Sequence, residues 1–386
     1  MRYLALFFWN QRKTERGARP FLIRALVRAA PFALIALVLS ASVFAQPEPK
    51  MRKKRKNEDK EPVTQSLPLL AEPPLAISAD TDRLTFQVSP LSNKGLLSQQ
   101  SRDALKGLMQ SNRGGTIVRL RAFVAGTGDM RRVQQIVSEA FGEKKLPLPV
   151  LSTVQVGSLP LVGAQVVMEA ISVDKRVLNP DGVAFVSGAR ATDLRSAVAQ
   201  LRNAVGPSGV SPAGVLSVTC FASSLDDNEA GRSELAASFP GAALNLMEAQ
   251  RTPADRFALC EAAGRMEPGS QAASNVVSGV VSGAQSAVVK SPKVVFSGIQ
   301  MAFGREDSDL RLAFDRLNKA LSSLVRAGGV VSARFYTLDR SLSQRLPLLG
   351  QDLFHRKVLA SATLEIEGLP SLDASVGMDV IAEGTN

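Results

Sequence analysis

The feature that most constrains this chain is an internal repeat, because one succession of apolar segments occurs three times along it. Each succession reads as a strand, an amphipathic helix, a glycine-containing turn, a strand, a second helix and two further strands. Two of the amphipathic helices carry apolar residues at i, i+3/4, i+7 and i+11, counted from Leu194 and Leu310, and a weaker copy of this pattern starts at Leu97. Such a chain is expected to fold as repeated units of a domain's usual size.

A β-rich segment follows each glycine turn, and we place one phenylalanine of each segment at an equivalent position. The segments cover residues 117–125, 215–223 and 330–338, and the phenylalanines are Phe123, Phe221 and Phe335. An aspartate after each segment is expected to cap the second helix: Asp129, Asp226 and Asp339. Because both helices of a unit can cover one face of a mostly antiparallel sheet, the predicted fold class is α+β.

The repeat divides the chain into six segments. We expect a signal peptide at 1–45, a basic and proline-rich linker at 46–80, a first unit at 81–174, a second at 175–267, a linker or insertion at 268–292 and a third unit at 293–386. Within the insertion, residues 279–290 are compatible with a linker or a hairpin, and their serine and glycine content favours the linker.

The first segment has the pattern of an export signal. An uncharged apolar run of 17 residues, 29–45, follows Arg24 and Arg28 and ends in small residues, which predicts cleavage between Ala45 and Gln46. The alternative is an uncleaved membrane anchor at 29–45, because basic residues follow soon afterwards from Lys50 to Lys56. We therefore expect an exported protein, periplasmic or secreted, with the anchored form left open.

The net charge of +11 is concentrated at the start of the chain. Residues 1–60 hold 14 basic and 4 acidic side chains, which leaves 32 basic against 31 acidic ones elsewhere. The folded part is thus nearly neutral, so we expect no nucleic-acid partner. The basic run at Lys50–Lys56 could contact a membrane surface, although a solvated linker is the commoner case.

Composition excludes several kinds of active site. The chain has one histidine, two cysteines and one tryptophan in 386 residues, too few for a zinc cluster, an iron–sulfur site or a Ser-His-Asp triad. We expect no metal and no cofactor. Cys220 and Cys260 lie in strands of the second unit and could form a disulfide in an exported protein, or remain as two small core residues.

The ordered set of segments resembles the Rid family (RidA/YjgF, the reactive intermediate imine deaminases) over about residues 80–383. The segments that carry the resemblance are residues 185–188 (FVSG), 296–300 (FSGIQ), 154–160 (VQVGSLP), 168–170 (MEA) and 260–262 (CEA). Members of this family are chorismate-mutase-like α+β domains that form homotrimers with ligand clefts between subunits. The resemblance therefore implies a single-chain pseudo-trimer of three RidA-like units, monomeric as a chain.

The family's chemistry depends on an arginine that binds the substrate carboxylate, nine residues before the proline of a Leu-Pro pair. Here those places are Leu151, Leu244 and Ser361. A second feature is an acidic residue two positions before the glutamate of Glu-Ala, and here those places are Val167, Leu259 and Gly377. The nearest arginine that a shifted alignment could offer is Arg251. The resemblance thus implies that imine deamination by the family's mechanism is absent.

The sequence leaves three functional hypotheses. The first is an exported, non-catalytic Rid-like protein that binds an unknown small molecule or a protein at its inter-unit clefts. The second is a divergent imine or enamine deaminase, acting on 2-iminobutanoate or 2-iminopropanoate, with residues that do not align. The third is an envelope-associated structural protein, tethered by the basic segment after the leader.

Overall fold

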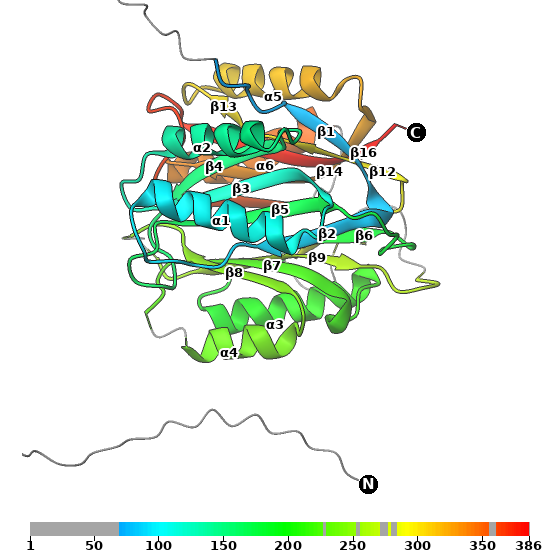
Figure 1. The fold of residues 1–386 in the computed structure, drawn as a ribbon. Coiled ribbons are helices and arrows are strands. Elements are labelled where there is room, and N and C mark those ends of the chain that lie inside the picture. Colours follow the sequence, from blue (N-terminus) through cyan, green and yellow to red (C-terminus); the bar gives the residue numbers. More distant parts are fainter. Residues whose placement is uncertain are drawn as a thin grey trace, which may run out of the picture. The chain divides into compact units, whose positions relative to one another are not determined.

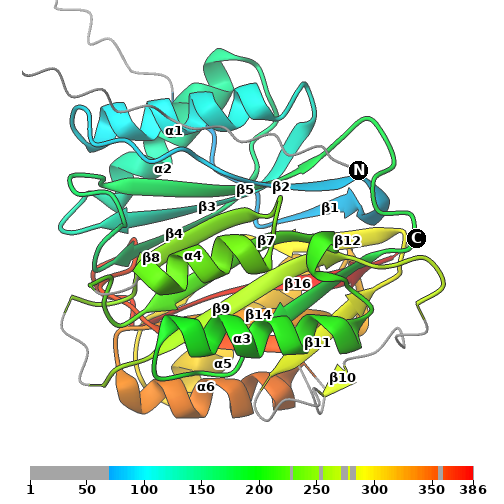
Figure 2. The same ribbon diagram turned by 90° about the horizontal axis from the view of Figure 1, so that it is seen from below.

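The computed structural model describes residues 69–385, apart from residues 227–228, 252–254, 271–276, 279–283 and 355–359. The described strands form three sheets, each with two helices packed on one face (Figures 1 and 2). The chain is α+β, as predicted, and the amphipathic helices form at the three predicted places.

The first sheet has the strand order β2-β5-β3-β4. Its strands are β2 (Leu84–Val88), β3 (Thr116–Ala125), β4 (Val150–Val156) and β5 (Val166–Val173). Helices α1 (Leu97–Ser111) and α2 (Met130–Glu143) bury their apolar sides against it. The Asp129 side chain accepts hydrogen bonds from the backbone of Arg131 and Arg132, which caps α2 as expected.

The second sheet has the order β10-β11-β6-β9-β7-β8. Its strands are β6 (Val183–Ser187), β7 (Val215–Ala222), β8 (Ala243–Glu248), β9 (Ala258–Arg265), β10 (Val277–Ser278) and β11 (Gln285–Val289). It is covered by α3 (Leu194–Val205) and α4 (Glu229–Ser238). Short 3₁₀ turns, η2 (Gly206–Ser208) and η3 (Pro212–Gly214), connect α3 to β7.

The third sheet has the order β1-β12-β16-β14-β15, with β13 paired to β16. Its strands are β1 (Ala76–Asp80), β12 (Lys293–Ser297), β13 (Gln300–Ala302), β14 (Val325–Thr337), β15 (Ala360–Glu365) and β16 (Val376–Gly384). Helices α5 (Asp307–Leu321) and α6 (Arg340–Leu353) pack on it. The 3₁₀ turn η1 (Thr81–Arg83) joins β1 to β2 of the first sheet.

Strands β1 and β11 lie within the segments 46–80 and 268–292, which were assigned to linkers. Residues 76–80, placed in the linker 46–80, form β1 and pair antiparallel with β12. Residues 285–289, placed in the linker or insertion 268–292, form β11 and pair antiparallel with β6. In the second segment β11 also pairs antiparallel with β10, which agrees with the hairpin alternative. β1 is followed in the chain by the first sheet but pairs with the third, and β11 is followed by the third sheet but pairs with the second. The order of segments along the chain does not predict such pairing.

The remaining apolar residues fill the space between the three sheets, on the faces turned away from the helices. One cluster gathers around Phe123, Phe221 and Tyr336, and another around Phe185, Phe296 and Ile381. Each sheet is therefore covered on both faces, by helices on one side and by the other sheets on the other.

Candidate functional site

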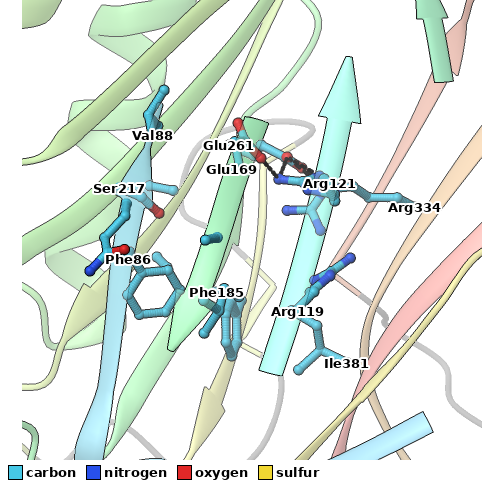
Figure 3. Close-up of a pocket in the computed structure, with 15 residues that line it drawn as sticks. Phe86, Val88, Arg119, Arg121, Glu169, Phe185, Ser217, Glu261, Arg334 and Ile381 are labelled. Atoms are coloured by element: carbon cyan, nitrogen blue, oxygen red, sulfur yellow. Dashed lines mark hydrogen bonds and ion pairs between the residues drawn. The ribbon is translucent and has the colours of Figure 1, made fainter. Parts of the chain in front are cut away.

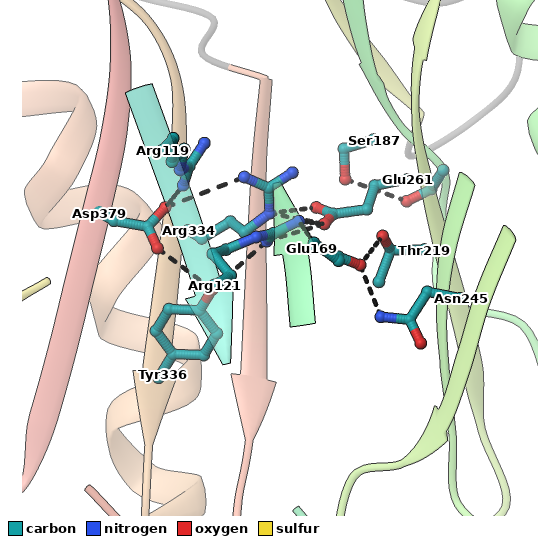
Figure 4. Close-up of polar contacts among 11 residues, drawn as sticks. Arg119, Arg121, Glu169, Ser187, Thr219, Asn245, Glu261, Arg334, Tyr336 and Asp379 are labelled. Carbon is teal, nitrogen blue, oxygen red and sulfur yellow. Dashed lines mark hydrogen bonds and ion pairs between the residues drawn. The ribbon is translucent and has the colours of Figure 1, made fainter. Parts of the chain in front are cut away.

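Charged side chains fill the place where the three sheets meet (Figure 4). Three arginines and three carboxylates lie there, with side chains at most 11% exposed. They are Arg119 and Arg121 on β3, Glu169 on β5, Glu261 on β9, Arg334 on β14 and Asp379 on β16. We call these six residues the charged centre.

Glu261 connects all three sheets. Nε of Arg334, on the third sheet, donates to both carboxylate oxygens at 2.6 Å. Nη1 of Arg121, on the first sheet, donates to Oε1 at 3.3 Å. Because Glu261 itself belongs to the second sheet, one carboxylate holds one group from each of the other two sheets.

Glu169 is bound by side chains of two sheets. It pairs with Arg121 of its own sheet and accepts hydrogen bonds from Thr219 Oγ1 and from Asn245 Nδ2, the latter at 2.7 Å. Burial raises the pKa of the Glu169 carboxyl, but the charge of Arg121 and the two hydrogen bonds outweigh burial and hold that pKa below its usual value. Glu169 is therefore ionised and fully paired.

Asp379 is the third carboxylate, and it is wholly buried. It pairs with Arg119 of the first sheet and accepts a hydrogen bond from the Tyr336 hydroxyl at 3.3 Å. Burial raises the pKa of Asp379, and the charges of Arg119 and Arg334 more than offset this and lower it. Burial, with Asp379 close by, raises the pKa of the Tyr336 phenol, so that it stays protonated and can donate.

Apolar layers bound the charged centre on both sides along the strands. On β5 the inward-facing residues are Val167, Glu169 and Ile171, because side chains of a strand alternate between its faces. On β9 the corresponding residues are Leu259, Glu261 and Ala263. The charges thus lie between two mostly apolar layers, which strengthens each ion pair and makes an unpaired charge costly.

One of these layers corrects the predicted equivalence of Phe335. Phe123 and Phe221 meet edge to face with ring centroids 5.7 Å apart, and the third aromatic side chain in their layer is Tyr336. Phe335 instead packs under α5 and α6, against Phe314. A shift of one residue along a strand moves a side chain to the other face, so the predicted alignment of the third strand was wrong by one position.

A cavity of about 40 Å³ adjoins the charged centre (Figure 3). Its walls include Phe86 on β2, Phe185 on β6, Ser217 on β7 and the guanidinium groups of Arg119 and Arg334. The volume is far below the several hundred Å³ of an ordinary ligand pocket. The three positive and three negative groups of the charged centre balance, and their pairing indicates a structural role in joining the sheets.

The three positions predicted for the carboxylate-binding arginine lie at the same register of their sheets, at the rim. Leu151 is paired with Leu120, Leu244 with Val218 and Ser361 with Ala333, in parallel β-ladders. Each lies near the first strand of another sheet, so the structure contains three rim sites that can be compared directly.

At Leu151 the structure has a groove of about 650 Å³ between β4, α2 and residues 298–303. The backbone oxygen of Leu151 accepts a hydrogen bond from Ile299 N at 3.2 Å. Residues 70–75 form part of the wall. An arginine, Arg131, also lines this groove, but its Nε donates to the Pro370 carbonyl at 3.2 Å and is thereby engaged.

At Leu244 there is a cleft of about 340 Å³ between β8, α4 and the chain that follows β2; we call it the Leu244 cleft. Its walls are mostly apolar, and the residues are Val88, Ser89, Leu91, Pro160, Val167, Arg232, Leu235, Leu244, Asn245 and Leu246. Nε of Arg232 is buried and has no hydrogen-bond partner among the described residues. A guanidinium therefore lies in this cleft, although it comes from a helix and not from position 244.

At Ser361 a side chain of the added strand β11 fills the corresponding place. The backbone N–H and the Oγ of Ser361 donate to Oε1 of Gln285 at 3.1 and 3.4 Å. Gln285 is the first residue of β11. The three rim sites thus differ: one is a groove, one is a cleft lined by an arginine, and one is occupied by Gln285.

The three positions predicted for the acidic residue lie deeper. Val167, Leu259 and Gly377 are paired with Phe123, Phe221 and Tyr336, at one level of the three sheets. Val167 and Leu259 are buried in the apolar layer, and Val167 also reaches the wall of the Leu244 cleft. A side chain at Gly377 would collide with Ile299, whose Cδ1 lies 2.6 Å from the position of a Cβ.

The structure also places three other residues from the sequence analysis, one arginine and two cysteines. Arg251 lies away from the Leu244 cleft and faces Glu367, with Nε and Oε2 4.0 Å apart. Cys220 on β7 and Cys260 on β9 are directly opposite each other, buried, and joined as a disulfide. The disulfide links two neighbouring inner strands of the second sheet on the face that α3 and α4 cover.

Sequence reasoning missed Arg232 and the charged centre. Arg232 gave no signal, because its helix was compared only through its expected capping aspartate, Asp226, and a lone arginine on a helix is usually solvated. The charged centre did give one: Glu169 and Glu261 belong to the segments MEA and CEA, and arginines at 121 and 334 lie close to aromatic residues on predicted strands. Buried charges of both signs at matching positions predict mutual pairing.

Several expectations fall on residues outside the described ranges. These are the cleavage site at Ala45 and Gln46, the anchor at 29–45 and the basic run Lys50–Lys56. Within the described residues, none of the helices has the length and hydropathy needed to cross a bilayer. The same residues hold no cluster of three His, Cys, Asp or Glu side chains suited to a metal ion.

No protein-family model matches the chain, and no curated protein matches its sequence. Similar solved structures include yeast Mmf1, with 17% identity, a TM-score of 0.22, and coverage of 24% of this chain and 80% of that one. A Rid-family protein of unknown function, YyfB from Yersinia pestis, has 22% identity and a TM-score of 0.21 over 25% and 80% of the two chains. A chorismatase has 12% identity and a TM-score of 0.37 over 81% and 78%. These likenesses concern the fold alone, and those to Mmf1 and YyfB extend over about a quarter of this chain.

Proposed function

We propose that this protein is a non-catalytic binding protein that holds a small carboxylate with an apolar body in the Leu244 cleft. The observation that carries the proposal is the guanidinium of Arg232, whose Nε is buried without a hydrogen-bond partner among the described residues, in the wall of a cleft of about 340 Å³. A buried donor without an acceptor is unfavourable, and a turn of the Arg232 side chain that brings its guanidinium onto an anionic ligand in the cleft would relieve this.

The walls of the Leu244 cleft favour a ligand with an aliphatic or aromatic portion. Leucine, valine and proline side chains make up most of the lining, and the polar groups are few. This combination of apolar surface with a small number of placed polar groups is typical of small-molecule sites. One guanidinium at such a site fits one carboxylate.

The lining offers no group for acid–base chemistry on the bound molecule. Among the described residues that line the Leu244 cleft there is no carboxylate, histidine or lysine, and Asn245 donates its Nδ2 hydrogen to Glu169. General acid–base catalysis requires a side chain that exchanges a proton within hydrogen-bond reach. The geometry therefore supports retention of the ligand better than deamination, the alternative hypothesis.

We also propose that the three sheets with their helices are three RidA-like units that form a pseudo-trimer within one monomeric chain. Support comes from the equal registers of the rim positions and from the ion pairs that connect the sheets. Light scattering should then report a single chain of 41.1 kDa, or less after removal of a leader. Export and the membrane contact at Lys50–Lys56 remain predictions.

Binding of sodium hexanoate, measured by isothermal titration calorimetry, tests the proposal. We expect binding to the wild-type chain and about tenfold or greater weakening in Arg232→Met, because a hydrogen bond to a charged group is lost. Hexanamide, the uncharged isostere, should bind no better to the wild type than to the variant. Arg131→Met, in the groove at Leu151, is the matched control and should bind like the wild type.

Two outcomes would contradict the proposal. Equal hexanoate binding by wild type and Arg232→Met would show that the guanidinium does not hold the ligand. Release of ammonia from an amino-acid-derived imine by the wild-type protein, lost in Arg232→Met, would instead establish a deaminase that uses this cleft.

A further inference from the structure

The outer edges of the three sheets differ in one respect. The first strands of the repeat are β2, β6 and β12, and their registers make Phe86, Phe185 and Phe296 equivalent, opposite Ile171, Ala263 and Ile381. Strand β1 pairs with the outer edge of β12, and β11 pairs with the outer edge of β6. Among the described residues, no strand pairs with the outer edge of β2.

The two added strands, β1 and β11, are connected to the rest of the chain in the same way. β1 runs through η1 into β2 of the first sheet, and β11 runs through residues 290–292 into β12 of the third sheet. Each added strand thus precedes the first strand of one sheet and pairs with another sheet. The corresponding segment before β6, residues 174–182, forms no strand, and Leu178 N and Asn179 N donate instead to the Asp82 carbonyl at 2.7 and 2.8 Å.

The side chains of β6 and β12, which each pair with an added strand, are more buried than those of β2, which does not. Phe296 beneath β1 is 0% exposed and Phe185 beneath β11 is 4% exposed, whereas Phe86 is only half-buried. All residues of β6 are buried, as are all but the first residue of β12, but only the first residue of β2 is buried. The edge of β2 is therefore uncovered at the positions where its counterparts are covered.

Strands β3, β14 and β7 lie across from the edges of β12, β6 and β2, and their exposure differs in the same way. Val118 on β3 and Val331 on β14 are 5% and 2% exposed, but their counterpart Leu216 on β7 is half-buried. Ser217, the next residue, lines the cavity that opens beside Phe86 and Gln87 (Figure 3). The space between β2 and β7, which we call the slot, thus has two partly exposed walls. The corresponding walls beside β1 and β11 are buried.

An unsatisfied polar atom lies at this edge. Oε1 of Gln87 is buried and has no hydrogen-bond partner among the described residues. Gln87 is equivalent to Val186, which is opposite Ser286 of β11. A strand placed on β2 as β11 is placed on β6 would bring a residue next to Gln87, and a serine there would offer its hydroxyl as a donor.

We propose that the outer edge of β2 is a docking slot for an extended segment of another polypeptide, which adds as an antiparallel strand between β2 and β7. Edge strands offer unpaired backbone groups, and strand addition to such an edge is a general mode of peptide recognition. The bound segment completes the first sheet in the way that β1 and β11 complete the other two.

The resident strands indicate which segment fits. Ile77 of β1 is opposite Phe296, and Ala287 of β11 is opposite Phe185. The partner segment is therefore about five residues long, has an alanine or small aliphatic residue opposite Phe86, and carries no charge at the residues next to it. A second copy of this chain is a poorer occupant, because a slot with walls on two sides admits one strand and not the edge of a sheet.

Fluorescence polarisation with the labelled synthetic peptide AQSAVVK, the sequence of residues 284–290, tests the proposal on the full chain. We expect saturable binding by the wild type. Ser217→Phe should abolish it by filling the slot, and Gln87→Ala should weaken it severalfold. The peptide AQSPVVK, which lacks one backbone N–H and carries a ring opposite Phe86, should not bind.

The matched control is Leu312→Ser, which alters an exposed leucine on α5 and should bind like the wild type. Circular dichroism of each variant establishes that the fold is kept. Binding that survives in Ser217→Phe would mean that the peptide replaces β11 on β6, and this would overturn the proposal. Absence of binding to the wild type, or pairing of two chains through β2 in light scattering, would also overturn it.

Discussion

The charged centre and the Leu244 cleft both contain arginine, but they use it differently. Arg121 and Arg334 in the charged centre lie among carboxylates of other strands, at distances of 2.6–3.4 Å for the contacts to Glu261. Arg232 in the Leu244 cleft is bordered by leucines and has a buried Nε without a partner among the described residues. Nε of Arg119 is also buried without a partner, but Arg119 pairs with Asp379 through Nη2, whereas Arg232 has no ion pair among the described residues. The contrast is therefore between arginines that have a carboxylate partner and one that has none.

Loss of a carboxylate from the charged centre should have the largest effect. Glu261→Gln leaves Arg121 and Arg334 buried without their shared partner, and removal of one member of a buried ion pair costs about 3–5 kcal/mol. The free energy of unfolding, measured with urea, checks this expectation. A loss of less than about 1 kcal/mol would show that water or a rearranged side chain replaces the carboxylate.

Removal of the disulfide should cause the second largest loss of stability, and this loss should not depend on the charge of nearby groups. Cys260→Ala in the oxidised protein should lower the free energy of unfolding by about 2–4 kcal/mol. The loss should be the same at pH 7 and pH 4, in contrast to changes in the charged centre. Wild-type protein unfolded in the presence of a reductant is the control, and it should approach the stability of the variant.

Acid should weaken the charged centre progressively. The pKa of Glu169 and that of Asp379 are lower in the folded chain than in the unfolded one, so the unfolded chain binds protons first as the pH falls below about 4. The stability contribution is complete above that pH and is lost as the pH falls through the folded values, at about 1.4 kcal/mol for each unit of depression. Urea unfolding between pH 7 and pH 3 measures it, and Asp379→Asn should flatten the dependence.

Replacement of Arg232 should have the smallest effect on stability. Arg232→Met removes a guanidinium whose Nε has no partner, so the free energy of unfolding without ligand should change by no more than about 0.5 kcal/mol. Thermal unfolding followed by circular dichroism would detect a larger loss. A cost of several kcal/mol would place Arg232 with the arginines of the charged centre and remove the contrast between the two regions.

The fold was largely predictable from the sequence, because it follows from local periodicity. The helices at Leu97, Leu194 and Leu310 lie where the apolar spacing placed them. The pairing of β1 with β12 and of β11 with β6 could not be predicted, since a short apolar strand does not encode which sheet it joins. The misplacement of Phe335 has a related cause, because two adjacent aromatic residues fit opposite faces of one strand equally well.

The candidate sites were less predictable. The rim positions Leu151, Leu244 and Ser361 do lie at one register, because the spacing to a Leu-Pro pair is a local property of the chain. Arg232 approaches Leu244 from a helix, through a tertiary contact that leaves no trace in sequence spacing. The ion pairs of the charged centre also depend on how the three sheets meet. The charged residues can be found in the sequence, but their partners cannot.

The pairing of β1 with β12 has a consequence for biosynthesis. Asp80 and Lys293, which pair at the end of this ladder, are 213 residues apart in the chain. A ribosome must therefore extend the chain past residue 297 before β1, the first of the described strands, can pair with β12. Until then that strand is an unprotected apolar edge, the kind of segment that chaperones bind and that aggregates when synthesis is interrupted.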